Sequence, residues 1–320
     1  MPKPFRRGTA VPAGALAVLL LLLSGCDSSA PADAGSAKST PGKKPQVLAT
    51  IGMIGDMAAR IAGDHARVDS MMQSGVDPHL YKATEGDVRR LGEADLILYN
   101  GLNLEGKMGD IFVKVGRTRP VVPVSETVPK EQLREPPEFQ GHYDPHIWFD
   151  VSMWTHAIDA IVPALSEIAP AHAAEFKANG EKLRGELAEL DEWVKKEIAT
   201  IPKERRVLVT AHDAFGYFGR RYDIEVMGLQ GISTVSQAGI GDVERLVTAI
   251  AGRKIPAIFV ESSVPKQAIE AVQRACESKG WPVKIGGQLF SDAMGAAGTP
   301  EGTYPGMVRH NVKTIVEALR

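Results

Sequence analysis

The sequence predicts an α/β protein with two lobes, each containing a parallel sheet, joined by one long rigid helix. Short runs rich in β-branched residues alternate with helical patterns along most of the chain, and this alternation is typical of parallel sheets. Four such runs precede a single long helical segment and four follow it. Each half of the chain therefore has enough strands for a (β/α)4-type lobe of its own.

The N-terminal residues indicate export. Basic residues precede an apolar run at residues 11–23, and the chain then reads Leu-Ser-Gly-Cys up to Cys26. The run is shorter than the ~20 apolar residues that span a bilayer, and its basic flank and small residues are typical of a secretory signal. The Leu-Ser-Gly-Cys sequence resembles the bacterial lipobox, which implies a signal peptide at residues 1–25 and a lipid on Cys26. The alternative is an ordinary signal peptide followed by an unrelated cysteine.

Composition divides the rest of the chain. Residues 26–45 consist mainly of Ser, Ala, Pro, Gly and Lys, which cannot build a core, so a flexible tether is predicted. The composition then becomes globular, and a chain of this length is natural for two lobes. We place the first lobe at residues 46–168, the linker helix at 169–201 and the second lobe at 202–320.

The expected strands are short, and each is followed by a helical stretch or a polar loop. Thr84 and Asp87 have the spacing of a capping box at the start of one helix, and Gly280 marks the end of another. The expected strands are residues 46–51, 66–72, 95–100 and 120–124 in the first lobe, and 205–211, 224–229, 256–261 and 281–286 in the second.

The segment between the lobes predicts one continuous helix of about 45 Å, at 1.5 Å per residue. Pro170 suits the first helical position, and apolar residues recur at helical spacings. Gly180 and Gly185 weaken the helix, but a helix of this length acts as a stiff strut rather than a hinge. The apolar stripe consists of Phe176, Leu183, Leu187, Leu190, Val194 and Ile198.

Charge and cysteine content exclude two classes of protein. The formal net charge is −2, and the sequence has no clustered positive charge of the kind that binds nucleic acid. Cys276 is the only cysteine besides Cys26, so the globular part has no partner for an internal disulfide. We interpret Cys276 as a small apolar residue without a reactive role.

Polar residues that follow the expected strands are the candidates for a binding site, because ligands of open parallel sheets bind beyond the carboxyl ends of the strands. His79 follows the second expected strand, and His146 follows the fourth after a long loop. His212 comes directly after the fifth strand, and Asp292 lies in the Gly-rich loop after the last one. These candidates fall two to each lobe.

Three imidazoles and one carboxylate are a suitable set of ligands for a divalent transition-metal ion. His79 and His146 each end an Asp-Pro-His sequence, in which the proline stiffens the backbone and reduces the entropy lost on binding. Asp77 and Asp144 precede these prolines, and each can cap the turn or accept a hydrogen bond from an imidazole. The alternative is two ordinary loop histidines after a common turn sequence.

The other polar residues have simpler interpretations. His142 either assists metal binding or is an exposed loop residue. Glu105 and Glu261 also lie near strand ends, and we interpret both as hydrogen-bonding partners of neighbouring loops. Surface or packing roles are expected for the remaining histidines, which are His65, His156, His172 and His310.

Several stretches of the chain resemble one known family. GVDPHLYKATEGDVRRLGEADLILYNGLNLEGKM, DPHIWFDV, RRVLVTAHDAFGYFGRRY, FVESSVP and GGQLFSDAMG are similar to the cluster A-I metal-binding lipoproteins of bacterial ABC importers, and most of all to zinc/manganese receptors of the TroA type. The resemblance covers nearly everything after the tether. It implies two lobes joined by one long helix and one metal ion in the cleft between them.

The resemblance also implies which residues bind the ion. Position by position, they are His79 and His146 from the first lobe and His212 and Asp292 from the second. Histidine at the third position is typical of zinc-binding members, whereas manganese-dedicated members tend to carry glutamate there. Many dedicated zinc receptors have a His-rich loop ahead of the second histidine, and here that loop has only His142. Both Zn²⁺ and Mn²⁺ are therefore candidates.

The function that the resemblance implies is capture and delivery of a metal ion. The chain would be an exported receptor, anchored by its lipid in the periplasm or on the outer face of the cytoplasmic membrane, that passes Zn²⁺ or Mn²⁺ to the transmembrane subunits of an ABC permease. We expect a monomer with no nucleic-acid partner and no enzymatic activity. The alternatives are a metal-dependent hydrolase, which needs an open coordination position and a general base, and a surface adhesin.

Overall fold

The computed structural model describes residues 43–139 and 141–320. The predicted signal peptide at residues 1–25, the predicted lipid site at Cys26 and the tether as far as residue 42 lie outside these residues. Among the described residues, no helix is both long enough and apolar enough to cross a membrane.

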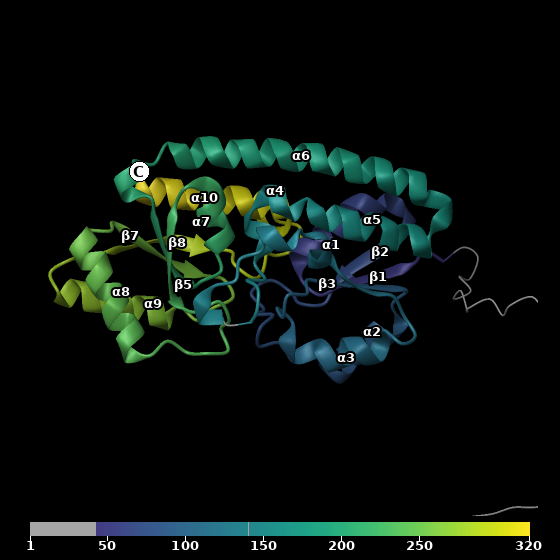
Figure 1. Cartoon of the computed structure of the whole chain (residues 1–320), viewed down its shortest axis with the longest axis horizontal. Helices are drawn as coiled ribbons and strands as arrows, with labels where there is room; N and C mark the ends of the chain where they lie inside the picture. The colour runs from purple at the N-terminus through teal and green to yellow at the C-terminus, as the bar shows by residue number, and fades with distance from the viewer. Residues whose placement is uncertain (1–42, 140) are drawn as a thin grey trace, which may run out of the picture. The chain divides into compact units, whose positions relative to one another are not determined.

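The first lobe contains a four-stranded parallel sheet in the order β2-β1-β3-β4 (Figure 1). In the central strand β1, Val47 pairs with Val68 on one side and with Leu96 on the other. The strands are β1 (Gln46–Ala49), β2 (Arg67–Ser70), β3 (Leu96–Tyr99) and β4 (Val121–Pro123), and the helices are α1 (Gly52–Ala62), α2 (Glu85–Glu93), α3 (Gly109–Val115), α4 (Val151–Trp154) and α5 (His156–Ile168).

The second lobe also has parallel strands. β5 pairs with β6, β7 pairs with β8, and β5 lies beside β7. The two-lobed α/β fold with parallel sheets that the sequence predicts is thereby confirmed. The strands are β5 (Val207–His212), β6 (Glu225–Gln230), β7 (Ala257–Glu261) and β8 (Lys284–Leu289), and the helices are α7 (Gly216–Tyr222), α8 (Ile240–Arg253), α9 (Gln267–Ser278) and α10 (Tyr304–Leu319).

Local signals in the sequence explain the boundaries of two helices. The Thr84 hydroxyl accepts a hydrogen bond from the Asp87 backbone N–H, and the Asp87 carboxylate accepts one from the Thr84 backbone N–H. This is the predicted capping box at the start of α2. Gly280 has a φ of +81° just after α9, where glycine adopts the left-handed region without a steric cost.

Strand β8 differs from the sequence prediction. It was expected at residues 281–286 and runs instead at residues 284–289. Pro282 has no N–H to donate to a strand ladder, and the Trp281 indole N–H donates to the Ile255 carbonyl at 2.8 Å. The strand therefore begins after this pair, and Asp292 follows closely after its end.

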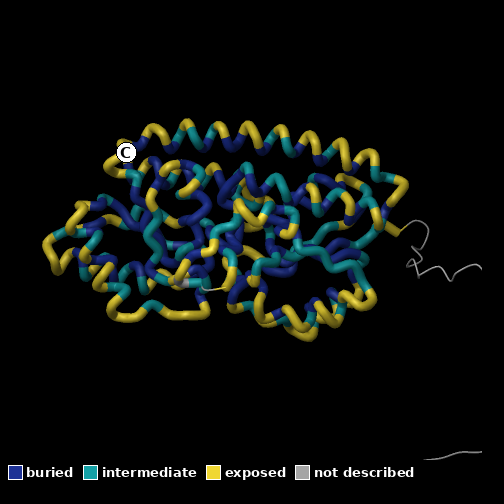
Figure 2. The backbone as a smooth tube through the Cα atoms, in the orientation of Figure 1, coloured by how far each residue is buried: buried dark blue, intermediate teal, exposed yellow. Residues whose placement is uncertain are grey.

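The linker helix α6 (Ala173–Ala199) is a single helix of 27 residues. It runs alongside both lobes (Figure 1) and contacts α1 and α5 of the first lobe and α7 and α10 of the second. All six residues of the predicted apolar stripe are buried, and Figure 2 shows the exposed residues of this helix along its outer side. Pro170 begins a 3-10 turn, Pro170–His172, directly before the helix.

The apolar core has two parts. The larger cluster includes residues of the first lobe together with α6, α7 and α10, and the smaller one lies between the strands of the second lobe and helices α8 and α9. Because α6 contributes its stripe to the larger cluster, the linker is packed into a core along its length. Asp191 adds a polar contact to the second lobe, since it accepts a hydrogen bond from Arg221 of α7 at 2.6 Å.

Two glycines in α6 provide a test of this packing. A Cβ at Gly180 would lie 2.9 Å from Val162 Cγ2 and 3.0 Å from Ile158 Cγ2, whereas at Gly185 it would meet no other element of the described chain within 4 Å. We expect Gly185→Ala to raise the free energy of unfolding by about 0.5–1 kcal/mol, because alanine is the better helix former. Gly180→Ala should lower it by about 1 kcal/mol, because overpacking costs more than this gain. Urea unfolding measures both values, and equal shifts would contradict the close packing of α6 on α5.

Candidate metal centre

Four polar side chains from both lobes converge beyond the carboxyl ends of the strands. His79 lies in the turn after β2, and His146 immediately precedes the 3-10 turn Ile147–Phe149. His212 is the last residue of β5, and Asp292 lies in the loop after β8. The structure thus brings together all four residues that the sequence analysis named as candidate ligands.

The ligand atoms of these residues lie within 4.8 Å of one another. Nε2 of His79 is 3.3 Å from Nε2 of His146. The Asp292 carboxylate is 3.3 Å from Nε2 of His146, 3.3 Å from Nε2 of His212 and 3.8 Å from Nε2 of His79. A tetrahedral shell with bonds of about 2.0–2.1 Å has ligand separations of about 3.3 Å. Three of the separations match this value, while that from Asp292 to His79 is longer, and Asp292 faces His146 with Oδ1 and the other two imidazoles with Oδ2.

All four side chains are buried, and Asp292 is only 1% exposed. Nε2 of His212 and both carboxylate oxygens of Asp292 have no hydrogen-bond partner among the described residues. A buried polar atom without a partner costs about 1–3 kcal/mol. These atoms, together with the other two imidazoles, fit one divalent ion that they would coordinate directly.

The second Asp-Pro-His sequence orients its histidine through its aspartate. Asp144 Oδ1 accepts hydrogen bonds from the backbone N–H of His146 at 3.0 Å and from its ring Nδ1 at 2.8 Å. The Asp144 carboxylate is held in turn by an ion pair with Arg134. Because Nδ1 is engaged, Nε2 is the nitrogen that faces the other ligands.

The first Asp-Pro-His sequence uses its aspartate differently. Asp77 Oδ1 accepts a hydrogen bond from the backbone N–H of His79 at 2.8 Å, which fixes the turn. Its other oxygen accepts one from the Thr234 hydroxyl of the second lobe at 2.6 Å. Both aspartates therefore cap their turns, but Asp144 also orients an imidazole, whereas Asp77 links the two lobes.

His212 is oriented by Glu261, at the end of the neighbouring strand β7. The Glu261 carboxylate accepts hydrogen bonds from the His212 backbone N–H at 2.9 Å and from its ring Nδ1 at 2.5 Å. The interpretation of Glu261 as a partner of neighbouring loops is wrong, because β7 lies beside β5 and brings Glu261 to His212, one of the four candidate ligands. For Glu105 that interpretation is confirmed, since its carboxylate accepts from the backbone N–H groups of Asn100 and Gly101 in the loop after β3.

The carboxylates around the site favour positive charge on two of the imidazoles. Burial opposes the protonation of His146, but Asp144 and Asp292 outweigh it and raise its pKa to about 9. Burial also opposes the protonation of His212, and the charges of Glu261 and Asp292 raise its pKa well above the usual value.

His79 and Asp292 respond in the opposite direction. Burial lowers the pKa of His79 to about 3, although the charge of Asp292 counteracts this effect. Burial alone would raise the pKa of Asp292, but His212 and His146 hold it well below its usual range. Asp292 is therefore an ionised carboxylate at the middle of the cluster, and His79 is a neutral imidazole, which is the form that binds metals.

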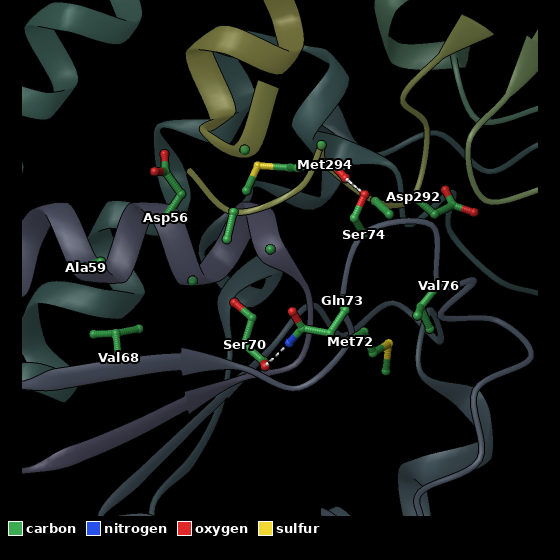
Figure 3. Close-up of a pocket in the computed structure, with 16 residues that line it drawn as sticks. Asp56, Ala59, Val68, Ser70, Met72, Gln73, Ser74, Val76, Asp292 and Met294 are labelled. Carbon is green, nitrogen blue, oxygen red and sulfur yellow. Dashed lines mark hydrogen bonds between the residues drawn. The ribbon is translucent and has the colours of Figure 1, made fainter. Parts of the chain in front are cut away.

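A pocket of about 340 Å³ adjoins Asp292, between α1, the chain after β2 and the loop after β8 (Figure 3). In Figure 3, Asp292 lies at the edge of this group of residues. Ser74 of the first lobe donates a hydrogen bond to the Met294 carbonyl of the second lobe at 2.8 Å. The pocket thus brings solvent close to the one carboxylate of an otherwise enclosed site.

The other histidines do not join this cluster. His142 is exposed, and its ring lies 5.3 Å from that of Phe139, which agrees with an exposed loop residue. His156 lies 3.8 Å from Asp159 on α5, and His310 contacts the Gln288 carbonyl. The two remaining histidines, His65 and His172, are stacked on each other.

The fold and the site define a class of protein: a two-lobed α/β protein with a long connecting helix and a buried cluster of three histidines and one aspartate that fits a single divalent ion. Comparison with known families is consistent with this class. The family described as zinc-uptake complex component A periplasmic, or ZnuA, matches residues 47–318. The chain belongs to the ZnuA family.

Individual relatives match over most of their length. The chain is 51% identical to the zinc-binding protein TroA of Treponema pallidum over 285 residues, which is 89% of this chain and 92% of TroA. It is 48% identical to the manganese-binding lipoprotein MntA of Bacillus subtilis over 299 residues, which is 93% of this chain and 95% of MntA. The solved structure of the periplasmic zinc-binding protein TroA from Treponema pallidum matches with a TM-score of 0.84 and 52% identity, over 87% of this chain and 99% of that one. These relatives are named as metal-binding proteins and not as enzymes.

The orienting role of Glu261 is testable with Glu261→Gln, which keeps the volume of the side chain but removes its charge. We expect the affinity for Zn²⁺, used as the probe ion, to fall about 10–100-fold, as is typical when the partner of a ligating histidine is lost. Glu105→Gln is the matched control, because it alters a buried carboxylate that contacts no ligand. Competition titration against a chromophoric chelator gives both affinities. An equal loss in the two variants would contradict the orienting role.

Proposed function

We propose that the chain is an extracytoplasmic solute-binding protein that captures one Zn²⁺ or Mn²⁺ ion with His79, His146, His212 and Asp292. The observation that carries this proposal is the convergence of four buried ligands, with both Asp292 oxygens and Nε2 of His212 lacking a hydrogen-bond partner among the described residues. The names of the zinc-binding relative TroA and the manganese-binding relative MntA support these two metals.

The bound ion is then passed to the transmembrane subunits of an ABC permease, and a lipid on Cys26 holds the chain near that permease. The description of the family as the periplasmic component of a zinc-uptake complex supports delivery, and the name of MntA as a lipoprotein supports the anchor. A tether raises the effective concentration of the protein at the permease. The proposed organisation of a monomeric chain is a signal peptide at 1–25, a tether at 26–45, lobes at 46–168 and 202–320, and the linker helix at 169–201.

The ligands favour zinc and permit manganese. Neutral imidazoles suit zinc, and the ligand separations near 3.3 Å suit four-coordinate geometry. Mn²⁺ prefers more ligands and more oxygen atoms. Asp292 presents two buried oxygens without partners among the described residues, so it can bind through both and enlarge the shell for manganese.

A hydrolytic role has less support. Four protein ligands fill a tetrahedral shell, whereas catalytic zinc sites keep a position open for water and place a general base beside it. Two nearby carboxylates, Asp144 and Glu261, bond to the Nδ1 atoms of His146 and His212, so they lie behind the ligands and not beside an ion. A third, Asp77, accepts hydrogen bonds from the His79 backbone N–H and the Thr234 hydroxyl.

Removal of one ligand separates the receptor from the hydrolase. We expect His212→Ala to lower the affinity for Zn²⁺ and Mn²⁺ by a factor on the order of 100 or more, because it removes one of the four ligands that coordinate the ion directly and exposes the other three to water. His156→Ala is the control, since His156 lies outside the cluster. Titration calorimetry measures the affinities, and unchanged binding by His212→Ala would refute the assigned site. Hydrolytic activity that the metal-loaded chain has and His212→Ala lacks would favour the enzyme.

Metal affinity should depend on pH because protons and metal ions compete for the same imidazole nitrogens. Free imidazole has a pKa of about 6.5, and the raised pKa values of His146 and His212 extend the competition to higher pH. A raised pKa means that more protons must be displaced at a given pH, so affinity should fall steadily from pH 7.5 to pH 5, by at least about tenfold. Titrations across this range measure the slope. A constant affinity would contradict coordination by three histidines.

A further inference from the structure

A second group of possible ligands lies where the first lobe meets the linker helix. His65 ends the 3-10 turn Gly63–His65 after α1, His172 ends the turn Pro170–His172, and Glu175 lies in the first turn of α6. Their ligand atoms lie within 4.8 Å of one another. We call these three residues the junction cluster, and they share no residue with the metal centre.

Both imidazoles of the junction cluster face the same carboxylate. Nε2 of His65 is 2.7 Å from Glu175 Oε2, and Nδ1 of His172 is 3.1 Å from Glu175 Oε1. The two rings are stacked, with centroids 3.7 Å apart and planes inclined by 18°. One nitrogen of each ring therefore already faces the same carboxylate, while the two rings themselves lie side by side.

A buried aromatic ring supports this arrangement. Phe176 has no exposed surface, and its ring centroid lies 6.1 Å from that of His65 and 6.3 Å from that of His172. The side chains of His65 and His172 remain 27% and 38% exposed, and that of Glu175 is 57% exposed. The cluster thus has a firm apolar base and stays open to ions in solution.

The three groups are also a suitable set of ligands for an ion. Each neutral ring can donate one N–H to Glu175, whereas protonation of both rings would place two like charges 3.7 Å apart at the ring centroids, which is unfavourable. A divalent ion instead uses one lone pair of each neutral ring and the charge of the carboxylate at once. Two histidines and one glutamate form a common set of protein ligands for zinc, with water in the fourth position. His172 and Glu175 also have the i, i+3 spacing that places two ligands on one helical turn.

We propose that the junction cluster is a second, solvent-accessible site for a divalent ion of the zinc type, held by Nε2 of His65, Nδ1 of His172 and a carboxylate oxygen of Glu175. The rings must rotate out of their stack so that their lone pairs meet at bonds of about 2.0–2.1 Å, and their partial exposure allows this rotation. With fewer protein ligands and more water around them, the affinity is lower than that of the buried centre.

The ligands of the junction cluster also make it selective. Imidazole suits Zn²⁺, Ni²⁺ and Cu²⁺, whereas Mn²⁺ is the weakest binder of the first-row series and prefers oxygen. The cluster therefore takes up zinc at concentrations at which it leaves manganese in solution. Because it joins the end of α1 to the start of α6, bound zinc also stabilises the attachment of the linker to the first lobe.

Calorimetric titration of the full chain with Zn²⁺, and separately with Mn²⁺, tests the second site. We expect a tight and a weaker equivalent of zinc, and His65→Ala and His172→Ala should each abolish the weaker one. His156→Ala is the matched control, because His156 lies 3.8 Å from a carboxylate on the same helical turn but belongs to no group of three ligands within the described chain. The affinity and stoichiometry for Mn²⁺ should be the same in the unaltered chain and in the three variants His65→Ala, His172→Ala and His156→Ala.

The outcomes separate this proposal from the proposed function, on which it does not rest. If His212→Ala removes the tight equivalent and leaves the weaker one, both sites stand. If His65→Ala alone removes an equivalent and His212→Ala changes nothing, the junction cluster stands and the proposed centre fails. Zinc binding that is the same in His65→Ala and in the unaltered chain overturns the junction cluster. Equal losses in His65→Ala and His156→Ala also overturn it, because they would show binding by surface histidines in general.

A further variant guards against loss of folding. Glu175→Gln keeps the volume of the side chain and should weaken the second zinc equivalent at least tenfold, while the far-ultraviolet circular dichroism stays unchanged. If Glu175→Gln binds zinc like the unaltered chain, Glu175 is not a ligand and the proposed set of three is overturned.

Discussion

The structure depends on holding one buried carboxylate, Asp292, against three imidazoles that come from separate segments of both lobes. Buried charges and unpaired polar atoms cost free energy, so the loop that carries Asp292 needs support from its surroundings. Asn311 of α10 bonds to both the backbone N–H and the carbonyl of Phe290. On the other side, the Trp148 indole of the first lobe donates to the Ser291 carbonyl at 3.1 Å. The backbone on either side of Phe290 and Ser291 is therefore fixed by both lobes, and Asp292 has little freedom to leave the cluster.

The same contacts limit how the lobes can move relative to each other. The Thr234 hydroxyl bonds to Asp77, and the Tyr304 hydroxyl of α10 bonds to the Trp148 carbonyl at 2.6 Å. Along the linker, Arg60 pairs with Glu186, and the apolar stripe of α6 is part of the larger core. A wide opening of the lobes would break the side-chain bonds across the cleft and would also strain a helix that is packed along its length. A local change in the loops that carry the ligands would leave the packing of α6 and the Arg60–Glu186 ion pair intact.

Periodicity and spacing were enough to predict the linker helix, the capping box at Thr84 and every strand except β8 close to its observed bounds, because each of these depends on residues that are close in sequence. β8 lies three residues later than predicted. The four candidate ligands could be named because the ends of parallel strands meet at one edge of a sheet. Contacts between distant segments could not be read in the same way. Glu261 reaches His212 because β5 lies beside β7, and His65 meets His172 because α6 begins against the end of α1. Nothing in the local sequence of either residue marks these partners.

The charges behind the ligands explain why this site suits a divalent cation. Asp144 is balanced by Arg134, and Asp77 is a further acidic group whose charge acts on the site. The carboxylates of Glu261 and Asp292 are both buried, and histidines are their ion-pair partners among the described residues. A dication among the imidazoles offsets the charge of these two carboxylates more fully than a singly charged ion does. The same two carboxylates raise the pKa of His212, and Asp292 with Asp144 raises that of His146, so the environment attracts positive charge from either protons or metal. Because protons and a divalent ion would be drawn by the same carboxylates, the proposed metal binding and its expected pH dependence have one physical origin in this fold.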